Sequence, residues 1–268
     1  MELRDRVAIV TGGASGIGKA MAERFAAEGA KGVVVADLQA DAATAVAATL
    51  GDVGLGIACD VTDDAAVGSL IAQTEERFGP VDVFCANAGI GVGGLVDTPD
   101  DVWDRVLNVN TRAHIVAARR LVPKWVDRGE GYFVATASAA GLVTQIGDAS
   151  YAVSKHAAVA FAEWLSVTYG DRGLRVSCLC PMGVDTPLLR GGLDVASDEG
   201  LGARVVAAAG RVLEPSEVAE AVVEAMREER FLILPHPEVL EFIRRKTSDY
   251  DRWIAGMRRL QAYVTGSS

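Results

Sequence analysis

The sequence predicts an α/β fold in which one doubly wound parallel sheet of about seven strands carries helices on both of its faces. The first observation is that short apolar runs alternate along the chain with alanine-rich segments of helical length. The second is that the apolar runs read as central strands, which are typical of a parallel sheet buried on both faces. The third is that no Pro/Ser-rich linker, long charge block or internal repeat interrupts the alternation. We therefore expect residues 1–268 to form a single domain.

Seven runs rich in β-branched and other apolar residues predict the strands, and most of them end at Gly, Asp, Asn or Ser. In order, they are residues 6–12, 32–38, 54–61, 81–89, 131–138, 174–181 and 231–235. Alanine-rich segments between them predict helices near residues 16–29, 40–50, 63–78, 99–127 and 150–171. Because strands and helices alternate, each strand–helix–strand unit is expected to add a parallel strand to the same sheet.

The pattern becomes less regular after Pro181. A Gly-rich stretch without clear periodicity predicts a substrate loop at about 187–212, because long irregular loops in compact domains often cover binding sites. A helix is expected at 215–230, before the last strand. From about 237 to 263, charged residues mix with apolar anchors, which predicts a helical C-terminal extension with solvated basic faces.

Composition argues against two classes of partner. Half of the residues are hydrophobic and 23% are charged, as in folded globular proteins. There are 26 Lys and Arg against 36 Asp and Glu, and the net charge of −10 opposes binding to nucleic acid or to anionic membranes.

The N-terminal segment has no apolar signal region and no apolar run approaches roughly 18 residues, so we expect a cytoplasmic protein that is neither secreted nor membrane-spanning.

No metal site is expected. Cys59, Cys85, Cys178 and Cys180 fall in apolar runs, where a free thiol behaves as a small hydrophobic residue. The histidines are His114, His156 and His236. They are scattered, and neither they nor the cysteines show the spacing of zinc ligands.

The segment TGGASGIG, residues 11–18, follows the first expected strand and opens the first expected helix. A helix N-terminus presents unpaired N–H groups and a partial positive charge, and glycines let a pyrophosphate approach that backbone closely. The spacing of Gly12, Gly16 and Gly18 differs from a Walker A loop, which would end in Gly-Lys-Ser/Thr. The alternative is a tight strand-to-helix turn without a ligand.

Asp37 closes the second expected strand, about 20 residues after the glycine loop. An acidic side chain near this position can accept hydrogen bonds from an adenosine ribose. Its charge would repel a 2′-phosphate, and Leu38 beside it offers no compensating positive charge. The expected cofactor is therefore NAD(H) in preference to NADP(H). The alternative is that Asp37 only caps a helix or forms a turn.

The motif YAVSK places Tyr151 and Lys155 four positions apart in an expected helix. Residues at i and i+4 lie on one helix face, where their side chains are close enough to interact. Such a pair also arises by chance on solvated helix surfaces, so the motif needs independent support.

Together these residues resemble the short-chain dehydrogenase/reductase family, over about residues 5–235. TGGASGIG is similar to the family's glycine loop, NAG at 87–89 to its central strand-end motif, and Asn110 in NVN to its helix asparagine. Ser138 precedes Tyr151 by the family spacing. The resemblance implies a Rossmann-like fold, the cofactor NAD, and a catalytic set. That set consists of Asn110, Ser138, Tyr151 and Lys155.

The resemblance also implies the cofactor-binding residues. They are Gly12, Ser15, Gly16, Ile17, Gly18, Asp37, Leu38, Asp60, Val61, Asn87, Ala88, Gly89, Tyr151, Lys155, Pro181, Gly183, Val184 and Thr186. Two positions depart from the family pattern. Ala86 stands where many members have Asn, and Met182 stands where the usual pattern has Gly. Both departures leave the implied contact residues in place.

For Tyr151 to act as an acid/base, the pKa of its phenol should fall from about 10 to about 7, which requires roughly 4 kcal/mol of phenolate stabilisation. A lysine ammonium about 4 Å away contributes on the order of 4 kcal/mol at an effective dielectric constant of about 20. Lys155 is therefore expected to lower this pKa. The resemblance implies that Lys155 also binds the cofactor ribose, that Ser138 holds the substrate oxygen, and that Asn110 helps to anchor a water in the proton path.

The substrate is expected above the carboxyl ends of the strands, between residues 139–148 and the segment after Thr186. The candidate wall residues are Leu142, Val143, Ile146, Leu188, Leu189 and Leu193. Because they are apolar, we expect a lipophilic secondary alcohol or its ketone. Gln145 and Asp148 are candidates for polar selectivity. Arg190 is the one basic residue of this region that stands out as a candidate for a substrate carboxylate, and the sequence does not reveal the direction of its side chain.

Two other functions stay open at this point. A non-catalytic dinucleotide-sensing protein would keep the fold but would have no need for Ser138, Tyr151 and Lys155. A nucleotide-sugar epimerase or dehydratase shares the Tyr-x-x-x-Lys pair but generally carries a larger C-terminal substrate domain than this chain has after Pro181. The resemblance also implies a homo-oligomer, a tetramer or a dimer, built on the helices that contain Asn110 and Tyr151.

Overall fold

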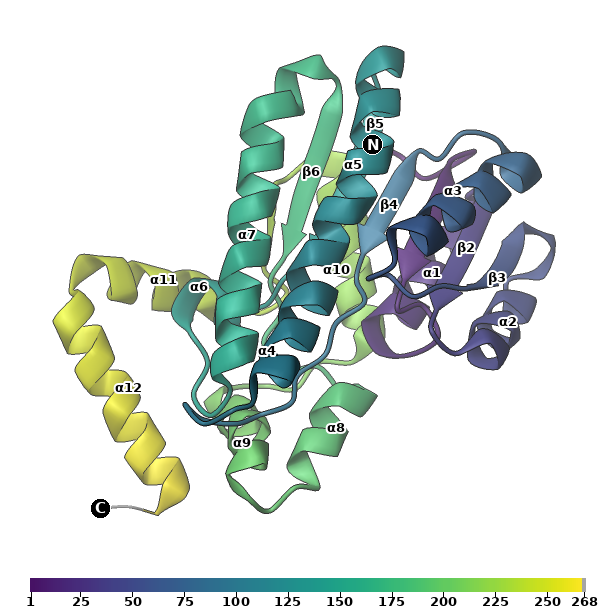
Figure 1. Cartoon of the computed structure of the whole chain (residues 1–268). Helices are drawn as coiled ribbons and strands as arrows, with labels where there is room; N and C mark the ends of the chain where they lie inside the picture. The colour runs from purple at the N-terminus through teal and green to yellow at the C-terminus, as the bar shows by residue number, and fades with distance from the viewer. Residues whose placement is uncertain (267–268) are drawn as a thin grey trace.

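A computed structural model describes residues 1–266 of the chain, apart from the side chain of Asp198 (Figure 1). Its centre is one sheet of seven parallel strands in the order β3-β2-β1-β4-β5-β6-β7. The strands are β1 (Val7–Thr11), β2 (Gly32–Asp37), β3 (Gly54–Ala58), β4 (Val83–Ala86), β5 (Gly131–Thr136), β6 (Leu174–Leu179) and β7 (Leu232–Ile233). Each lies within an expected strand segment, and the predicted parallel sheet is confirmed.

Helices cover both faces of the sheet (Figure 1). On one face lie α1 (Gly16–Ala27), α2 (Ala40–Thr49) and α10 (Pro215–Glu228), and on the other lie α3 (Asp64–Phe78), α5 (Ala113–Arg128) and α7 (Ala149–Tyr169). Their apolar side chains form two core clusters, with Phe25 and Val222 in the first and Leu121 and Leu165 in the second. Each fully buried side chain of this kind contributes roughly 1.5–3 kcal/mol. Burial on both faces therefore explains why the strands are continuous apolar runs.

The chain reverses its course across the sheet between β1 and β4. β1 pairs with β2 on one side and with β4 on the other, so the connections that leave these two strands diverge. In open parallel sheets, ligands bind at the carboxyl ends of the strands where such connections diverge. The glycine loop, residues 87–89 and Ser138 all lie at this edge.

The helix expected at 99–127 is divided in the structure. α4 (Asp100–Leu107) is followed by a five-residue π-helical segment, Asn108–Arg112, and then by α5. A π-turn widens the helix locally, and such turns are frequent at functional sites. Here the segment carries Asn110, which is completely buried.

Shorter helices and turns complete the chain. They are α6 (Ala140–Val143), α8 (Pro187–Leu193), α9 (Leu201–Ala209), α11 (Glu238–Ser248), α12 (Tyr250–Thr265) and the 3-10 turns Gly51–Val53, Gly170–Arg172 and Asp198–Gly200. Segment 187–212, expected as a loop, is thus largely helical. α8 begins where the Thr186 hydroxyl accepts a hydrogen bond from Leu189 N (3.3 Å) and Pro187 occupies the first turn, both of which favour a helix start.

The four cysteines are free and buried, and Cys178 and Cys180 lie on one side of β6 with their sulfur atoms 3.7 Å apart. Within residues 1–266, no group of three or more His, Cys, Asp or Glu side chains is arranged to hold a metal ion. Among the same residues, no helix has the length and apolar character needed to cross a bilayer.

Candidate active site

The glycine loop packs tightly between β4 and α1. Gly12 has a φ of +62°, and a Cβ at this position would lie 2.9 Å from the Cα of Ala88. A Cβ on Gly18 would lie 2.2 Å from the carbonyl oxygen of Gly12, because the helix rests directly on the loop. The residues at the start of α1 that line the cavity are Ser15, Gly16 and Ile17. The loop therefore presents bare backbone and the N-terminus of a helix to the cavity.

Asp37 and Leu38 lie at the end of β2, beside the glycine loop. The Asp37 carboxylate accepts two backbone hydrogen bonds, Oδ2 from Ala14 N and Oδ1 from Gln39 N, both at 3.1 Å. These bonds fix the carboxylate at the cavity wall, and each oxygen keeps a lone pair for a further donor. Leu38 is exposed and adds an apolar surface to the same wall. The other predicted residues at this end are Asp60 and Val61.

Thr11 holds residues 87–89 against β1. Its hydroxyl donates a hydrogen bond to Cys85 O (3.0 Å). The same hydroxyl accepts bonds from the N–H groups of Asn87 (2.9 Å) and Ala88 (3.1 Å). The Asn87 amide donates in return to Thr11 O (2.9 Å). Thr11 therefore joins the two central strands where the cavity begins, a role that its place in the glycine motif does not reveal.

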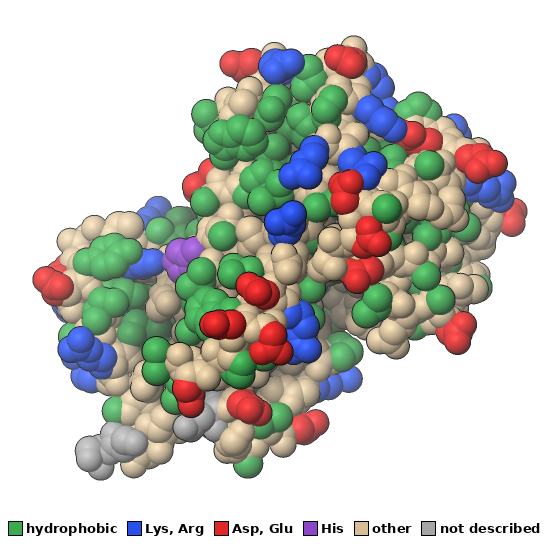
Figure 2. All heavy atoms as spheres, viewed as in Figure 1, with side chains coloured by type: hydrophobic (Ala, Val, Ile, Leu, Met, Phe, Trp, Pro, Cys, Tyr) green, Lys and Arg blue, Asp and Glu red, His purple; other side chains and the backbone are tan. Residues whose placement is uncertain are grey.

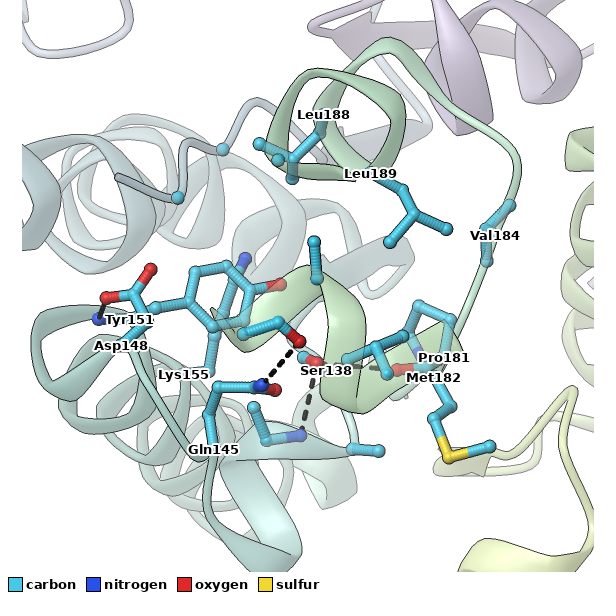
Figure 3. A pocket seen from close by; sticks show the side chains of 18 of the residues that line it. Ser138, Gln145, Asp148, Tyr151, Lys155, Pro181, Met182, Val184, Leu188 and Leu189 are labelled. Atoms are coloured by element: carbon cyan, nitrogen blue, oxygen red, sulfur yellow. Dashed lines mark hydrogen bonds between the residues drawn. The ribbon is translucent and has the colours of Figure 1, made fainter. Parts of the chain in front are cut away.

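The side chains of Ser138, Tyr151 and Lys155 converge in the cavity, as Figure 3 shows. Ser138 follows β5, and its hydroxyl accepts a hydrogen bond from Ala140 N (3.1 Å) and donates to Pro181 O (3.4 Å). Tyr151 and Lys155 lie one turn apart near the start of α7, and the Lys155 Nζ is 5.5 Å from the centroid of the Tyr151 ring. Hydroxyl groups from two elements thus face one region of the cavity beside a buried ammonium group.

The surroundings of Tyr151 and Lys155 disfavour the charged form of each side chain. Enclosure by the protein raises the pKa of Tyr151 to about 12, although the nearby Ser138 hydroxyl acts to lower it. Burial lowers the pKa of Lys155 to about 8. Lys155 is 3% exposed, and its Nζ donates a hydrogen bond to Thr136 O (3.0 Å). The expectation that the pKa of Tyr151 falls to about 7 is therefore wrong for this structure, because the loss of water around the phenol has the largest effect.

Asn110 supports the cavity from behind its wall. Its Oδ1 accepts a hydrogen bond from Ile90 N, and its Nδ2 donates to Ile90 O, both at 2.8 Å. Nδ2 also donates to the Ser154 hydroxyl on α7 (3.0 Å). A Cβ on Gly89 would lie 3.3 Å from both Asn110 Oδ1 and Lys155 Nζ. Asn110 thus connects the loop after β4 to α7 through hydrogen bonds. The water that the resemblance implies at this residue stays a prediction.

Asp148 is part of the cavity wall, but its carboxylate oxygens already accept hydrogen bonds from other groups of the protein. As the N-cap of α7, its Oδ1 accepts hydrogen bonds from Tyr151 N (2.9 Å) and the Ser150 hydroxyl (3.1 Å). Its Oδ2 accepts from Val92 N (3.2 Å) and Gly93 N (2.9 Å). Asp148 is therefore a positioning residue that joins the first turn of α7 to the loop after β4, and the expectation that it provides polar selectivity is wrong.

His236 fixes the backbone that follows β6. Its Nδ1 accepts a hydrogen bond from Met182 N, and its Nε2 lies near Gly183 O and Arg211 O, each at 3.1 Å. The acceptor role of Nδ1 requires the tautomer with hydrogen on Nε2. Met182 does not have a positive φ, so a side chain fits where the family pattern has Gly. No local motif marks His236, because its partners are 25 to 54 positions away in sequence.

A cavity of about 1650 Å³ joins the glycine loop, the three converging side chains and the helices α8, α9 and α12. The predicted cofactor-binding residues that line it are Gly12, Ser15, Gly16, Ile17, Asp37, Leu38, Asp60, Val61, Asn87, Ala88, Gly89, Tyr151, Lys155, Pro181, Val184 and Thr186. Gly18 and Gly183 lie behind this lining. Gly18 allows the loop and α1 to touch, and Gly183 O accepts hydrogen bonds from His236 and from Leu213 N (2.9 Å).

The substrate end of the cavity matches part of the expected wall. Its apolar residues include Val143, Ile146, Leu188 and Leu189. The expected residues that lie outside the lining are Leu142, Leu193 and Arg190. The Arg190 guanidinium makes two hydrogen bonds of 2.6 Å to Asp185, so it is paired within the protein and does not line the cavity. The Gln145 Nε2 donates to two backbone carbonyls, which leaves its Oε1 as an acceptor.

Comparison with known proteins identifies relatives over nearly the whole chain. The family model described as short chain dehydrogenase matches residues 6–193. A 1-deoxy-11-beta-hydroxypentalenate dehydrogenase of Streptomyces exfoliatus is 37% identical over 262 residues, which cover 95% of this chain and 92% of that protein. A 2-(R)-hydroxypropyl-CoM dehydrogenase of Xanthobacter autotrophicus is 38% identical over 197 residues, which cover 70% of this chain and 78% of that protein.

The fold also matches that of a solved structure. A short chain dehydrogenase/reductase from Burkholderia phymatum, in complex with NAD, has a TM-score of 0.85 at 30% identity. The match covers 94% of this chain and 96% of that one. With the glycine loop, Ser138, Tyr151 and Lys155 gathered at one edge of the sheet, the chain belongs to the short-chain dehydrogenase/reductase family.

Proposed function

We propose that the protein is an NAD(H)-dependent oxidoreductase that interconverts a lipophilic secondary alcohol and its ketone. The observation that carries the proposal is the convergence of Ser138, Tyr151 and Lys155 in the cavity that also contains the glycine loop. Two relatives are named as dehydrogenases of hydroxylated compounds, which supports the same class of reaction on a CH–OH group.

The residues of the inner cavity fit NAD(H). A Cβ at Gly12 or Gly18 would fill the cradle at the start of α1, where N–H groups and the helix dipole favour a pyrophosphate. The fixed carboxylate of Asp37 offers acceptors to an adenosine ribose and repels a 2′-phosphate, which favours NAD(H) over NADP(H). When bound, this cofactor accepts or supplies the hydride.

The protein's own side chains handle the hydroxyl proton. In alcohol oxidation, Tyr151 Oη takes the proton of the substrate hydroxyl, and in ketone reduction it gives a proton to the carbonyl oxygen. Because its pKa is raised to about 12, Tyr151 holds its proton at neutral pH and is ready to act as an acid. Ser138 holds the substrate oxygen near Tyr151. Lys155, which is hydrogen-bonded to Thr136 O, places a positive charge near the phenol when the phenol ionises.

Substitution of Tyr151 tests the proposal. With NAD and a panel of secondary alcohols, we expect the Tyr151→Phe variant to lose turnover by at least ~100-fold, the usual scale for loss of a general acid/base. Its affinity for NADH should stay nearly unchanged, because only one oxygen atom is removed. NADH absorbance measures turnover, and fluorescence titration measures binding.

A matched control is Tyr169→Phe at the other end of α7, which should retain full turnover. Near-normal turnover of Tyr151→Phe would overturn the mechanism. NADH binding without net turnover of any alcohol or ketone would instead point to a dinucleotide sensor or an epimerase.

We also propose that the protein acts as a homo-oligomer, a tetramer or a dimer, in the cytoplasm. Apolar side chains of Val153, Trp164 and Val167 are exposed along α7, and Figure 2 shows apolar side chains gathered over the upper part of this helix. Apolar patches of this kind favour contact with another protein surface. The four free thiols are compatible with a reducing compartment.

A further inference from the structure

α12 forms the outer wall of the substrate end of the cavity. Its residues Met257 and Leu260 pack on a small apolar cluster next to the site. The buried members of this cluster are Ile146, Leu201 and Val205. Figure 1 shows α12 standing at the side of the molecule, away from the sheet. The C-terminal extension is thus part of the cavity and not a separate appendage.

The cavity is larger than a single small ligand requires. Its volume of about 1650 Å³ exceeds the roughly 300–1,000 Å³ of typical ligand pockets. The cofactor takes the end beside the glycine loop, and the reacting carbon of the substrate lies at Tyr151. The space between Tyr151 and α12 is left for the rest of the substrate. A molecule that fills this space is elongated, with its far end at α12.

Two arginines flank this far end. Arg252 and Arg259 lie two turns apart on one face of α12, and both line the cavity. The Nη2 of Arg259 lies 3.7 Å from the position of a Cβ on Gly256, so the guanidinium lies over a cavity-lining residue. Within residues 1–266, neither guanidinium forms an ion pair. Arg245 also lines the cavity, but its Nε donates to Glu241 (2.9 Å).

Carboxylates at the same end only partly offset these charges. Asp249 and Glu199 line the cavity near α12 and lower the positive potential there. Asp249 is the N-cap of α12, and its Oδ1 accepts a hydrogen bond from Arg252 N (2.9 Å). Asp148, deeper in the cavity, is occupied by four internal donors. In a chain with a net charge of −10, two unpaired arginines at a cavity wall favour an anionic ligand.

Trp253 adds an aromatic side chain to the same end of the cavity. Its indole Nε1 is buried and has no hydrogen-bond partner among the described residues. The ring lines the cavity next to Arg252 and packs on Phe242, with ring centroids 6.4 Å apart. A buried donor without an acceptor costs roughly 1–3 kcal/mol.

We propose that the substrate is an elongated apolar alcohol or ketone with a carboxylate at the end remote from the reacting carbon. The carboxylate binds the guanidinium groups of Arg252 and Arg259, whose planar forks match its geometry. Met257 and Leu260 contact the apolar body of the substrate. The inference rests on the proposed function, because it assigns the far end of the substrate that reacts at Tyr151.

Two substrates of equal length test the inference, 11-hydroxydodecanoate and 11-hydroxydodecanamide, which end in an anionic carboxylate and in a neutral amide. We expect the acid to have a KM roughly tenfold lower than the amide. The double variant Arg252→Gln/Arg259→Gln should lose this preference, because the KM of the acid rises toward that of the amide. Added salt should raise the KM of the acid only, because exposed charges are screened.

The matched control is Arg244→Gln/Arg258→Gln, which removes two exposed arginines from α11 and α12 that do not line the cavity. This variant should keep the preference for the acid. Equal KM values for acid and amide, or equal losses in both double variants, would overturn the inference.

Calorimetric titration with dodecanoate and dodecanamide separates the inference from the proposed function. Tighter binding of dodecanoate that depends on Arg252 and Arg259 supports the anion site even if no alcohol is oxidised. Turnover of 11-hydroxydodecanamide that depends on Tyr151, with equal affinity for dodecanoate and dodecanamide, would leave the proposed function standing and overturn the anion site.

Discussion

Tyr151 is held as a neutral phenol by its surroundings, and this predicts a different pH dependence for the two directions of the reaction. With a pKa raised to about 12, its phenolate fraction increases throughout the neutral and mildly alkaline range. Alcohol oxidation needs the phenolate as a base, so its kcat/KM should rise by up to about tenfold per pH unit. Above a pH of about 8, Lys155 loses its proton, and the rise should become less steep. Ketone reduction needs the phenol proton and should stay nearly level.

Initial rates in both directions with one alcohol–ketone pair measure this difference. The residual activity of Tyr151→Phe is the control and should show little of the alkaline rise. Profiles of the same shape for oxidation and reduction would contradict the assignment of Tyr151 as the group that carries the proton.

At the scale of residues, spacing along the chain predicts which side chains meet but not their environment. Tyr151 and Lys155 are one helical turn apart, so the sequence alone places them together. The direction of the Tyr151 pKa shift depends on how fully distant segments enclose the ring, and spacing carries no such information. In the sequence, Asp148 likewise looks available to bind a substrate. In the structure, its Oδ2 accepts hydrogen bonds from the N–H groups of Val92 and Gly93, which belong to another loop.

At the scale of elements, the backbone conformation of the segment after β6 depends on His236. This histidine follows β7 in sequence and is hydrogen-bonded to Met182 and Gly183. The His236→Phe variant removes the acceptor of Met182 N, and a buried donor left without an acceptor costs roughly 1–3 kcal/mol. It also removes a donor from Arg211 O and from Gly183 O, although Gly183 O keeps its hydrogen bond from Leu213 N. We expect a lower melting temperature. The affinity for NADH should also fall several-fold, because Val184 follows this backbone into the cofactor end of the cavity. Thermal unfolding and NADH titration measure the two effects.

The His236→Gln variant separates hydrogen bonding from packing, since an amide offers both an acceptor and a donor and should restore part of the loss. His156→Gln on α7 is the control and should change neither measurement. Unchanged stability and NADH affinity in His236→Phe would show that this histidine does not hold the segment.

Elements with strong periodicity could be predicted from the sequence, and elements built by tertiary contacts could not. The seven strands are apolar runs because both faces of the sheet are covered, so their burial is visible in the sequence. The π-turn at Asn108–Arg112 lies within a helical sequence pattern, so the pattern does not mark it. Its Asn110 is hydrogen-bonded to Ile90, which belongs to a separate segment of the chain. α8 is seven residues long and contains Gly191 and Gly192, which are poor helix formers, so its sequence predicts a loop.

At the scale of the whole molecule, α7 presents an apolar surface that the single chain leaves uncovered. Val167 is 87% exposed and Trp164 is 53% exposed. Trp164 stacks on Phe161, with centroids 6.1 Å apart, and meets Tyr169 edge-on at 5.8 Å, so the aromatic side chains form one patch. Burial of each large apolar side chain contributes roughly 1.5–3 kcal/mol. A second copy of the chain that packs on this helix would gain that free energy at both copies of the patch.

We therefore expect the protein to elute with a mass that is a multiple of 28.1 kDa and the Trp164→Glu/Val167→Glu variant to elute as a monomer. The carboxylates would have to be buried without partners in the assembly, which is strongly unfavourable. Size-exclusion chromatography with light scattering measures the mass of each variant. Val96→Glu, at an exposed position outside α7, is the matched control and should leave the mass unchanged. A monomeric wild-type protein, or a double variant with the wild-type mass, would show that this face of α7 is not an interface.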